Sequence, residues 1–228
     1  MAGAIAHHYN NQLQVVLGNL ELAMDTLPAC AAARENLTAA IQAAHRAAEV
    51  STQMLAYLGQ SSGEKQPLNL SEVCRQNIPL LLSTMPVVLD TDFVMPGPLI
   101  SANANQLQQL LLNLVTNAWE AVGSNRGAIH LKVSTVPATG ILNSVRFPAD
   151  WQPQASAYAC LEVADAGCGI AEADLEKIFD PFFSRKFLGR GLGLAVVLGI
   201  ARAHDAGITV ESEPGQGSTF RVYFPLAT

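Results

Sequence analysis

Apolar residues recur at three- and four-residue spacing through the first quarter of the chain and predict two long amphipathic helices. The first apolar face comprises Ile5, Tyr9, Leu13, Val16, Leu17, Leu20, Met24 and Leu27, and Pro28 ends the run. A second, alanine-rich run over residues 31–58 carries Leu37, Ile41, Ala44, Ala48, Leu55 and Leu58 at similar spacing. Two such helices predict an antiparallel hairpin. Because one hairpin cannot bury both apolar faces, the pattern favours a homodimer in which two hairpins form a four-helix bundle.

The pattern changes after a polar stretch, residues 59–67, that is rich in turn-forming residues. Short β-like runs at 129–136, 158–163, 208–210 and 219–224 are interspersed with helical segments at 71–82, 106–122, 171–178 and 194–203. This mixture predicts an α/β sandwich, and with the helical hairpin it gives an α+β chain. We expect the hairpin at 1–62, a linker at 63–70 and the sandwich domain at 71–228. Residues 137–157, which contain several prolines, are expected to form a surface loop.

Composition narrows the classes of function. Of the 228 residues 50% are apolar, which is enough to bury a sizeable core. The formal net charge is -6 with only 13 Lys+Arg, so neither a nucleic-acid partner nor contact with an anionic membrane is expected. The four cysteines lack metal-ligand spacing and indicate free thiols in a reducing compartment. We therefore expect a cytoplasmic fragment, although a longer parent protein could be attached to a membrane.

Three polar motifs in the second domain suggest a nucleotide site. On the helix predicted at 106–122, Asn113, Asn117 and Glu120 follow one another at i, i+4 and i+7 and share a face. Magnesium prefers oxygen ligands, and an asparagine carbonyl can supply one without adding charge. Asp165 follows an apolar strand and precedes Gly167 and Gly169, where its carboxylate could accept a hydrogen bond from an exocyclic amine such as that of adenine.

The third motif is a glycine-rich run, Gly189, Gly191 and Gly193, that leads into an apolar helix. Free backbone N–H groups and the positive end of the helix dipole suit a polyphosphate. Arg185, Lys186 and Arg190 could add charge at the terminal phosphates. The run is neither a Walker A loop nor a Rossmann fingerprint.

These motifs, taken in order, resemble the GHKL ATPase fold and, within it, the sensor histidine kinases of two-component signalling. Residues 113–118 look like the N box, 165–170 the G1 box, 179–183 the F box, 189–193 the G2 box and 215–220 the final glycine box. The resemblance implies Mg²⁺ on Asn117, adenine on Asp165, and a short lid over ATP at 183–189. It also implies ATP contacts at Asn113, Gly167, Gly169, Lys186, Arg190, Gly191, Leu192, Gly193 and Leu194, with Ser218 or Thr219 near the base.

The N-terminal helix resembles the phosphoacceptor box of the same family. In that box a histidine is followed by an acidic residue, an aromatic and two asparagines; residues 6–13 resemble it, and His7 stands at the acceptor position. The acidic neighbour is replaced by His8, whose imidazole could serve as the general base because its unperturbed pKa is about 6.5. Asn11 resembles the position that orients water for dephosphorylation of a partner regulator.

The leading hypothesis is a dimeric ATP- and Mg²⁺-dependent protein-histidine kinase. It would phosphorylate His7 and pass the phosphoryl group to an aspartate of a response-regulator receiver domain. One alternative, suggested by His8, is a degenerate or phosphatase-biased scaffold that binds nucleotide and a receiver domain. A second is a simple GHKL ATPase, which is disfavoured because such enzymes resemble this chain but carry a glutamate where Asn113 stands, and an amide cannot take a proton from water.

Overall fold

The computed structural model divides the chain into two compact units, Met1–Gln60 and Ser61–Thr228. It describes residues 2–28, 33–57, 64–123, 127–141, 145–183 and 191–227, and in the two N-terminal helices it describes the side chains of 12–28, 33–44, 47 and 48. Within these residues no helix is both long enough and apolar enough to cross a membrane.

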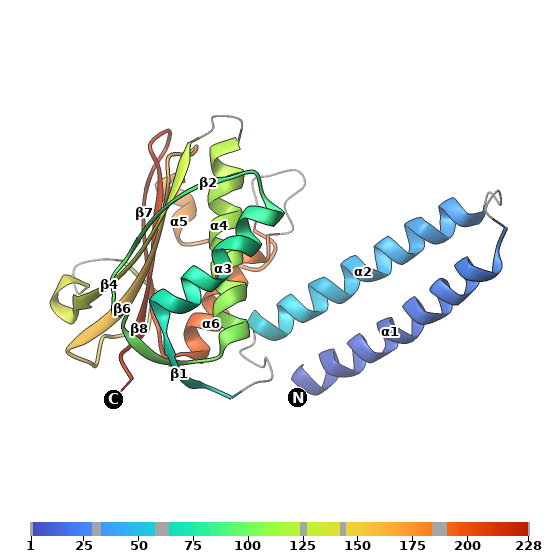
Figure 1. Cartoon of the computed structure of the whole chain (residues 1–228), viewed down its shortest axis with the longest axis horizontal. Coiled ribbons are helices and arrows are strands. Elements are labelled where there is room, and N and C mark those ends of the chain that lie inside the picture. The colour runs from blue at the N-terminus through green and yellow to red at the C-terminus, as the bar shows by residue number, and fades with distance from the viewer. Residues whose placement is uncertain are drawn as a thin grey trace. The chain divides into compact units, whose positions relative to one another are not determined.

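The first unit is an antiparallel hairpin of α1 (Ala2–Thr26) and α2 (Ala33–Tyr57), as predicted (Figure 1). Leu17 and Ala44 are buried between the helices. Arg34 closes the end of α1, because its Nη1 donates to the carbonyl oxygens of Met24 at 2.7 Å and Leu27 at 2.8 Å. Met24 lies in the last turn of α1 and Leu27 lies just after it, so neither carbonyl oxygen has a helical N–H to accept from.

The second unit is a two-layer sandwich in which a sheet is covered on one face by helices (Figure 1). The six-stranded sheet has the order β2-β4-β6-β8-β7-β5, and only the β2/β4 pair is parallel. Its strands are β2 (Val88–Phe93), β4 (Ala128–Pro137), β5 (Arg146–Phe147), β6 (Ala157–Asp165), β7 (Gly207–Glu213) and β8 (Gly217–Pro225). A separate antiparallel pair is formed by β1 (Gln66–Asn69) and β3 (Leu99–Ala102), and an isolated bridge links Ile100 of β3 to Leu226. The predicted α+β class, with a hairpin followed by a sandwich, is confirmed.

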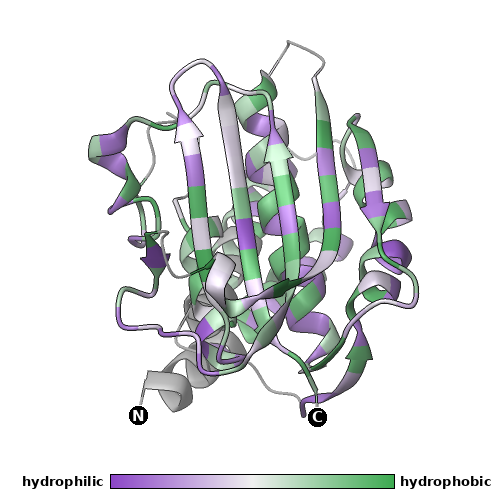
Figure 2. Cartoon of the chain, turned by 90° about the vertical axis from the view of Figure 1, so that its left-hand side faces the viewer, coloured by the Kyte–Doolittle hydropathy of each residue, from purple (hydrophilic) through white to green (hydrophobic). Residues whose placement is uncertain are grey.

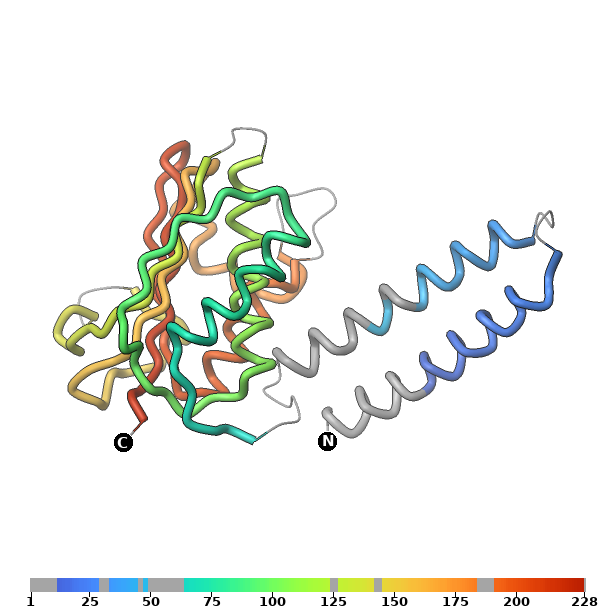
Figure 3. Tube along the Cα trace, in the orientation of Figure 1, coloured from blue at the N-terminus to red at the C-terminus, as the bar shows by residue number. Residues whose placement is uncertain are grey.

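Four helices accompany the sheet: α3 (Leu70–Thr84), α4 (Ala104–Val122), α5 (Glu172–Leu175) and α6 (Gly193–Ala203). Alternation along the strands sends apolar side chains toward α4 and α6 and polar ones outward, which Figure 2 shows as alternating bands on the open face. On that open face Arg221 pairs with both Glu162 and Glu211, and Lys132 pairs with Asp92 at 2.6 Å. The strand order places β8 between β6 and β7, inside the sheet, and Figure 3 shows the red C-terminal segment alongside the orange one of β6.

Several sequence expectations differ from the structure at the edges of the sandwich. Strands β1, β2, β3 and β5 were not predicted, and β1 falls within the stretch expected as the linker. The helix expected at 171–178 is only the four-residue α5, followed by turns. Residues 137–157 are not simply a surface loop, because they contain the edge strand β5, which pairs with β7.

Trp151, in the 137–157 segment, packs against residues at the C-terminal end of α6 and the start of β7. Its indole Nε1 donates to the Asp205 carbonyl oxygen at 3.0 Å, and its ring lies so close to Gly207 that a β-carbon there would collide with it. The ring also meets Tyr158 edge-on with centroids 5.6 Å apart. Trp151 thereby packs against a small second core that includes Tyr158 and Tyr223.

Three of the four cysteines lie in the described part of the chain, and all three are free thiols there. Cys74 and Cys160 are buried, and burial raises the pKa of each thiol to about 12. Cys168 is exposed at the turn after β6.

A buried histidine joins the end of α6 to the start of α4. His204 Nδ1 donates to the Ile200 carbonyl oxygen at 2.8 Å, so Nε2 is the acceptor for the Asn103 N–H at 3.1 Å. Asn103 in turn caps α4, because its side chain accepts from the N–H groups of Asn105 and Gln106. Burial is the main cause that lowers the pKa of His204, with the nearby Lys65 contributing in the same direction.

The unfolding free energy should therefore contain a contribution from neutral His204. This contribution is complete above about pH 6.5, the unfolded value, and is lost as the pH falls toward the lower folded value. Urea unfolding at pH 7.5 and pH 5.5 should show a larger loss of stability in the parent than in His204→Gln, which cannot titrate. Equal losses in the two proteins would contradict this role.

Candidate functional site

The asparagines of α4 are held where the helix meets α6. Leu110, Leu111, Leu114, Val115 and Ala118 bury the opposite side of α4 in the core, as the periodicity predicts. The Nδ2 atoms of Asn113 and Asn117 are buried and have no hydrogen-bond partner. A buried unpaired amide costs about 1 to 3 kcal/mol, so two side by side indicate a site completed by a ligand.

The N-terminus of α6 lies directly against these two amides. A β-carbon at Gly193 would be 3.5 Å from Asn117 Nδ2 and 3.7 Å from Asn113 Oδ1. Leu192 provides no side-chain cap, and the first helical hydrogen bond runs from Val196 N–H to the Leu192 carbonyl. The N–H groups of the first turn are thus presented at a helix end whose dipole favours an anion.

Gly191 lies just before α6 and contacts Phe182. Its carbonyl oxygen accepts from the Phe182 N–H at 2.8 Å, and its φ is +62°. A β-carbon there would be 2.5 Å from the Phe182 carbonyl carbon. Leu192 is buried and Leu194 is partly buried in the first turn that follows. Lys186, Arg190 and the lid expected at 183–189 lie outside the described residues, apart from Phe183.

Asp165 ends β6 and begins a tight turn. Its Oδ1 accepts from the Gly167 N–H at 2.8 Å, and its side chain is half-buried. A hydrogen bond joins the turn to the end of α4, because the Cys168 N–H donates to the Ala121 carbonyl oxygen at 3.1 Å. The two segments are also in close contact, since a β-carbon at Gly167 would be 2.5 Å from the Ala121 carbonyl carbon. Asn113, Asn117 and Asp165 thus border one region, which lies between helices α4 and α6 and the end of strand β6.

The β7/β8 hairpin completes the region. Its Gly215 N–H donates to the Cys168 carbonyl at 2.8 Å, and β-carbons at Gly169 or Gly217 would collide with backbone oxygens of the facing segment. Ser218 is paired directly with Asp165 and is buried on the same face of the sheet. Thr219 lies on the opposite face, where it is paired with Glu211. Of the two residues expected near a base, the register supports Ser218.

Ser212 was missed by the sequence analysis. Its hydroxyl accepts from the Ile170 N–H at 2.8 Å and so connects β7 to the Asp165 turn. The alternation of Ile208, Val210 and Ser212 places it on the inward face and could have identified it.

The residues present fit a magnesium–nucleotide complex. Asn113 and Asn117 could each present a side-chain amide oxygen to Mg²⁺, because rotation about the last side-chain bond exchanges the oxygen with the unpaired Nδ2. Neutral oxygen ligands leave room for phosphate oxygens and water in the octahedral shell. Within the described residues there is no group of three or more His, Cys, Asp or Glu side chains that could hold a metal without such a partner.

The phosphoacceptor candidates belong to the first unit. His7, His8 and Asn11 all fall within α1, which confirms that they are helical, but their side chains lie outside the described ones.

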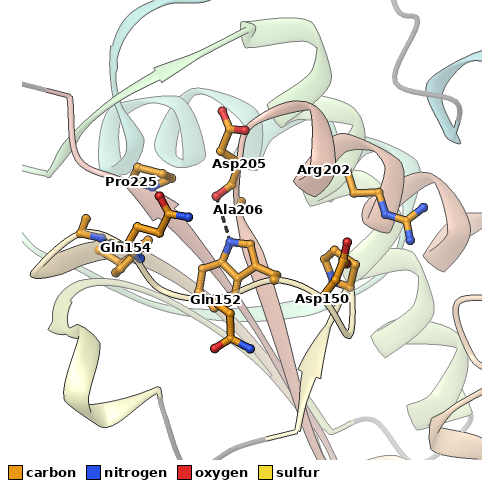
Figure 4. Close-up of a pocket in the computed structure, with 11 residues that line it drawn as sticks. Asp150, Gln152, Gln154, Arg202, Asp205, Ala206 and Pro225 are labelled. Atoms are coloured by element: carbon orange, nitrogen blue, oxygen red, sulfur yellow. Dashed lines mark hydrogen bonds between the residues drawn. The ribbon is translucent and has the colours of Figure 1, made fainter.

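A pocket of about 500 Å³ lies elsewhere, at the C-terminal end of α6 (Figure 4). It is lined by Trp151, Arg202, Asp150, Asp205, Gln152 and Gln154 among others, and by none of the predicted nucleotide residues. The 11 residues of α6 separate it from Gly193 by about 16 Å. The unpaired amides of Asn113 and Asn117 lie at the other, N-terminal end of α6.

Residues 102–228 match the family described as histidine kinase-, DNA gyrase B-, and HSP90-like ATPase. Among curated proteins, the chain is 31% identical to the sensor kinase CckA of Brucella abortus (strain 2308), covering 99% of this chain and 24% of that protein. It is 30% identical to the sensor histidine kinase ZraS of Klebsiella oxytoca, covering 99% of this chain and 46% of that protein. Among solved structures, full-length ShkA in complex with AMPPNP is similar, with 25% identity and a TM-score of 0.74, covering 100% of this chain and 46% of that one. The chain thus spans less than half the length of these relatives.

Proposed function

Because the chain belongs to the family of histidine kinase-, DNA gyrase B- and HSP90-like ATPases, we propose that it is the catalytic core of an ATP-dependent protein-histidine kinase. The observation that carries the proposal is the pair of buried, unpartnered amides of Asn113 and Asn117 against the N-terminus of α6. The similarity to sensor kinases covers 99% of the chain, including the α1/α2 hairpin, and supports the kinase function over a simple ATPase.

In this proposal the triphosphate lies at the first turn of α6. Backbone N–H groups there donate to phosphate oxygens, and the glycines at 191 and 193 let the backbone approach closely. Asn117, with Asn113 beside it, holds Mg²⁺, which when bound neutralises part of the phosphate charge. Asp165 accepts a hydrogen bond from the adenine amine at the other end of the site.

His7 is the proposed nucleophile. Its Nε2 attacks the γ-phosphorus, the bond to the β,γ-bridging oxygen breaks, and ADP leaves. The phosphoryl group then passes to an aspartate of a response-regulator receiver domain. Asn113 argues against hydrolysis as the main reaction, because an amide cannot deprotonate water.

Dimerisation through the first unit is supported by apolar side chains that the hairpin leaves uncovered. On α1, Val15 is 61% exposed, Val16 47% and Leu22 66%. A second hairpin packed on this surface would bury them and form the four-helix bundle.

The test is incubation of the chain with γ-labelled ATP and Mg²⁺, scoring protein-bound label that is acid-labile and alkali-stable. Such label is expected. ATP binding without label under dimerising conditions would instead support the second candidate, a phosphatase-biased or degenerate scaffold, which the replacement of the acidic neighbour by His8 favours.

Asp165→Asn is expected to weaken ATP binding by about 10-fold or more, because a charge-assisted hydrogen bond to the adenine amine is lost. Calorimetric titration with ATP and Mg²⁺ measures the change. Asp150→Asn is the matched control, since Asp150 lines the pocket at the far end of α6 and should leave the affinity unchanged. An unchanged affinity for Asp165→Asn would refute the placement of adenine.

A further inference from the structure

Three inward-facing residues of neighbouring strands form one row at the end of the sheet. Asp165 of β6 is paired with Ser218 of β8, and Ser218 is paired with Ser212 of β7. Side chains of directly paired residues lie on one face and within contact distance. Ser218 therefore lies between Ser212 and Asp165, the residue proposed to contact adenine.

The hydroxyl of Ser212 makes three hydrogen bonds, whose directions are fixed by the chemistry of the partners. The Ile170 N–H at 2.8 Å can only donate to it, and the Gly217 carbonyl oxygen at 2.9 Å can only accept from it. A hydroxyl has one hydrogen and two lone pairs, so the hydrogen of Ser212 is taken by Gly217. The remaining contact, to Ser218 Oγ at 2.9 Å, must then have Ser218 as the donor.

The direction of this hydrogen bond determines whether Ser218 can donate to a ligand or accept from it. Its only hydrogen points at Ser212, so toward any other partner Ser218 Oγ is an acceptor. Ser218 is 5% exposed and faces the same side as Asp165.

Adenine and guanine differ in the group at the corresponding ring position. The adenine amine has two hydrogens to donate, whereas guanine presents an acceptor oxygen. Asp165 can take one hydrogen of the amine and a Ser218 held as an acceptor can take the other. An oxygen in that place would face two acceptors and no donor.

We propose that Ser212 is a specificity-determining positioning residue, which keeps Ser218 as an acceptor and so favours adenine over guanine nucleotides. The inference rests on the proposed ATP site. It adds a residue that touches no ligand itself and acts through the orientation of one hydroxyl. Without Ser212, the Ser218 hydroxyl is free to turn and donate to a guanine oxygen.

The experiment compares the affinities of the whole chain for Mg²⁺·ATP and Mg²⁺·GTP by calorimetric titration. In Ser212→Ala the preference for ATP over GTP, expressed as the ratio of the two affinities, is expected to fall by about 10-fold. A change of this size corresponds to the net contribution of one or two hydrogen bonds. Ser212→Thr retains the hydroxyl and should restore the ratio. Ser83→Ala, which removes an exposed hydroxyl bonded to Leu80 within α3, is the control and should leave the ratio as in the parent.

The outcomes separate the two proposals. If Ser212→Ala weakens both nucleotides equally, the ATP site stands and the specificity role of Ser212 is overturned. If the parent binds neither nucleotide, the ATP site and this inference fail together. Should Ser212→Ala not fold, Ser218→Ala removes the same acceptor, and an unchanged ratio in that variant would overturn the inference.

Discussion

Replacing His7 by glutamine is expected to reduce acid-labile phosphorylation of the chain to background. Glutamine has no nucleophilic nitrogen comparable to the imidazole Nε2, so no phosphohistidine can form at this position. ATP affinity should be unchanged, because the proposed nucleotide site lies wholly in the second unit. Labelling with γ-labelled ATP and calorimetric titration of the same preparation measure the two quantities.

Two further variants test whether the loss of label is specific to His7 and whether His8 acts as the general base. His130→Gln is the matched control, because His130 lies exposed on β4 beside Asp90 and should label like the parent. His8→Gln should slow labelling by on the order of 10²- to 10⁴-fold if His8 serves as the general base. Label that persists in His7→Gln would place the acceptor elsewhere and refute the proposed phosphoacceptor.

Gly217→Ala is expected to destabilise the second unit by about 3 kcal/mol or more and to abolish measurable ATP binding. The new β-carbon would collide with the Asp165 carbonyl oxygen at a φ of +95°. The β6/β8 pairing would have to open at Asp165 and Ser218, the two residues that we place around the base. Urea unfolding and ATP titration report the two effects.

The same hairpin offers a control that separates the collision from backbone strain. Gly215 also has a positive φ, +79°, but a β-carbon there would meet nothing within 4 Å. Gly215→Ala should therefore cost only the conformational penalty of about 1 to 2 kcal/mol and retain ATP binding. Equal damage from both substitutions would show that the φ angle, and not the close approach to Asp165, determines the effect.

The sequence predicted the parts of the fold that rest on local periodicity. The helices around Leu17 and Leu114 and the strands around Leu131 and Val222 have clear apolar patterns, and each was found in place. Asn113 and Asn117 were placed together because residues four apart share a helix face. Their lack of hydrogen-bond partners required the structure.

What the sequence could not predict depends on contacts between distant segments. Strand β5 has two residues and exists only because β7 pairs with it, and Trp151 is ordered by Gly207 and Asp205 more than fifty positions away. Alternation places Ser212 on the inward face of its strand, but its hydrogen bond to the Ile170 N–H, 42 positions away, could be found only in the structure. The choice between Ser218 and Thr219 likewise depended on strand register, which local pattern does not determine.

The position of β8 in the sheet has a consequence for biosynthesis. Its residues Gly217–Pro225 pair with both β6 and β7, yet they are synthesised after both of these strands. Before they emerge, β6 and β7 each present an unpaired inner edge, so the second unit cannot assemble until β8 has been synthesised. The α1/α2 hairpin, whose contacts are local in sequence, can form much earlier. A nascent chain is therefore able to associate with a second copy before either copy can bind nucleotide.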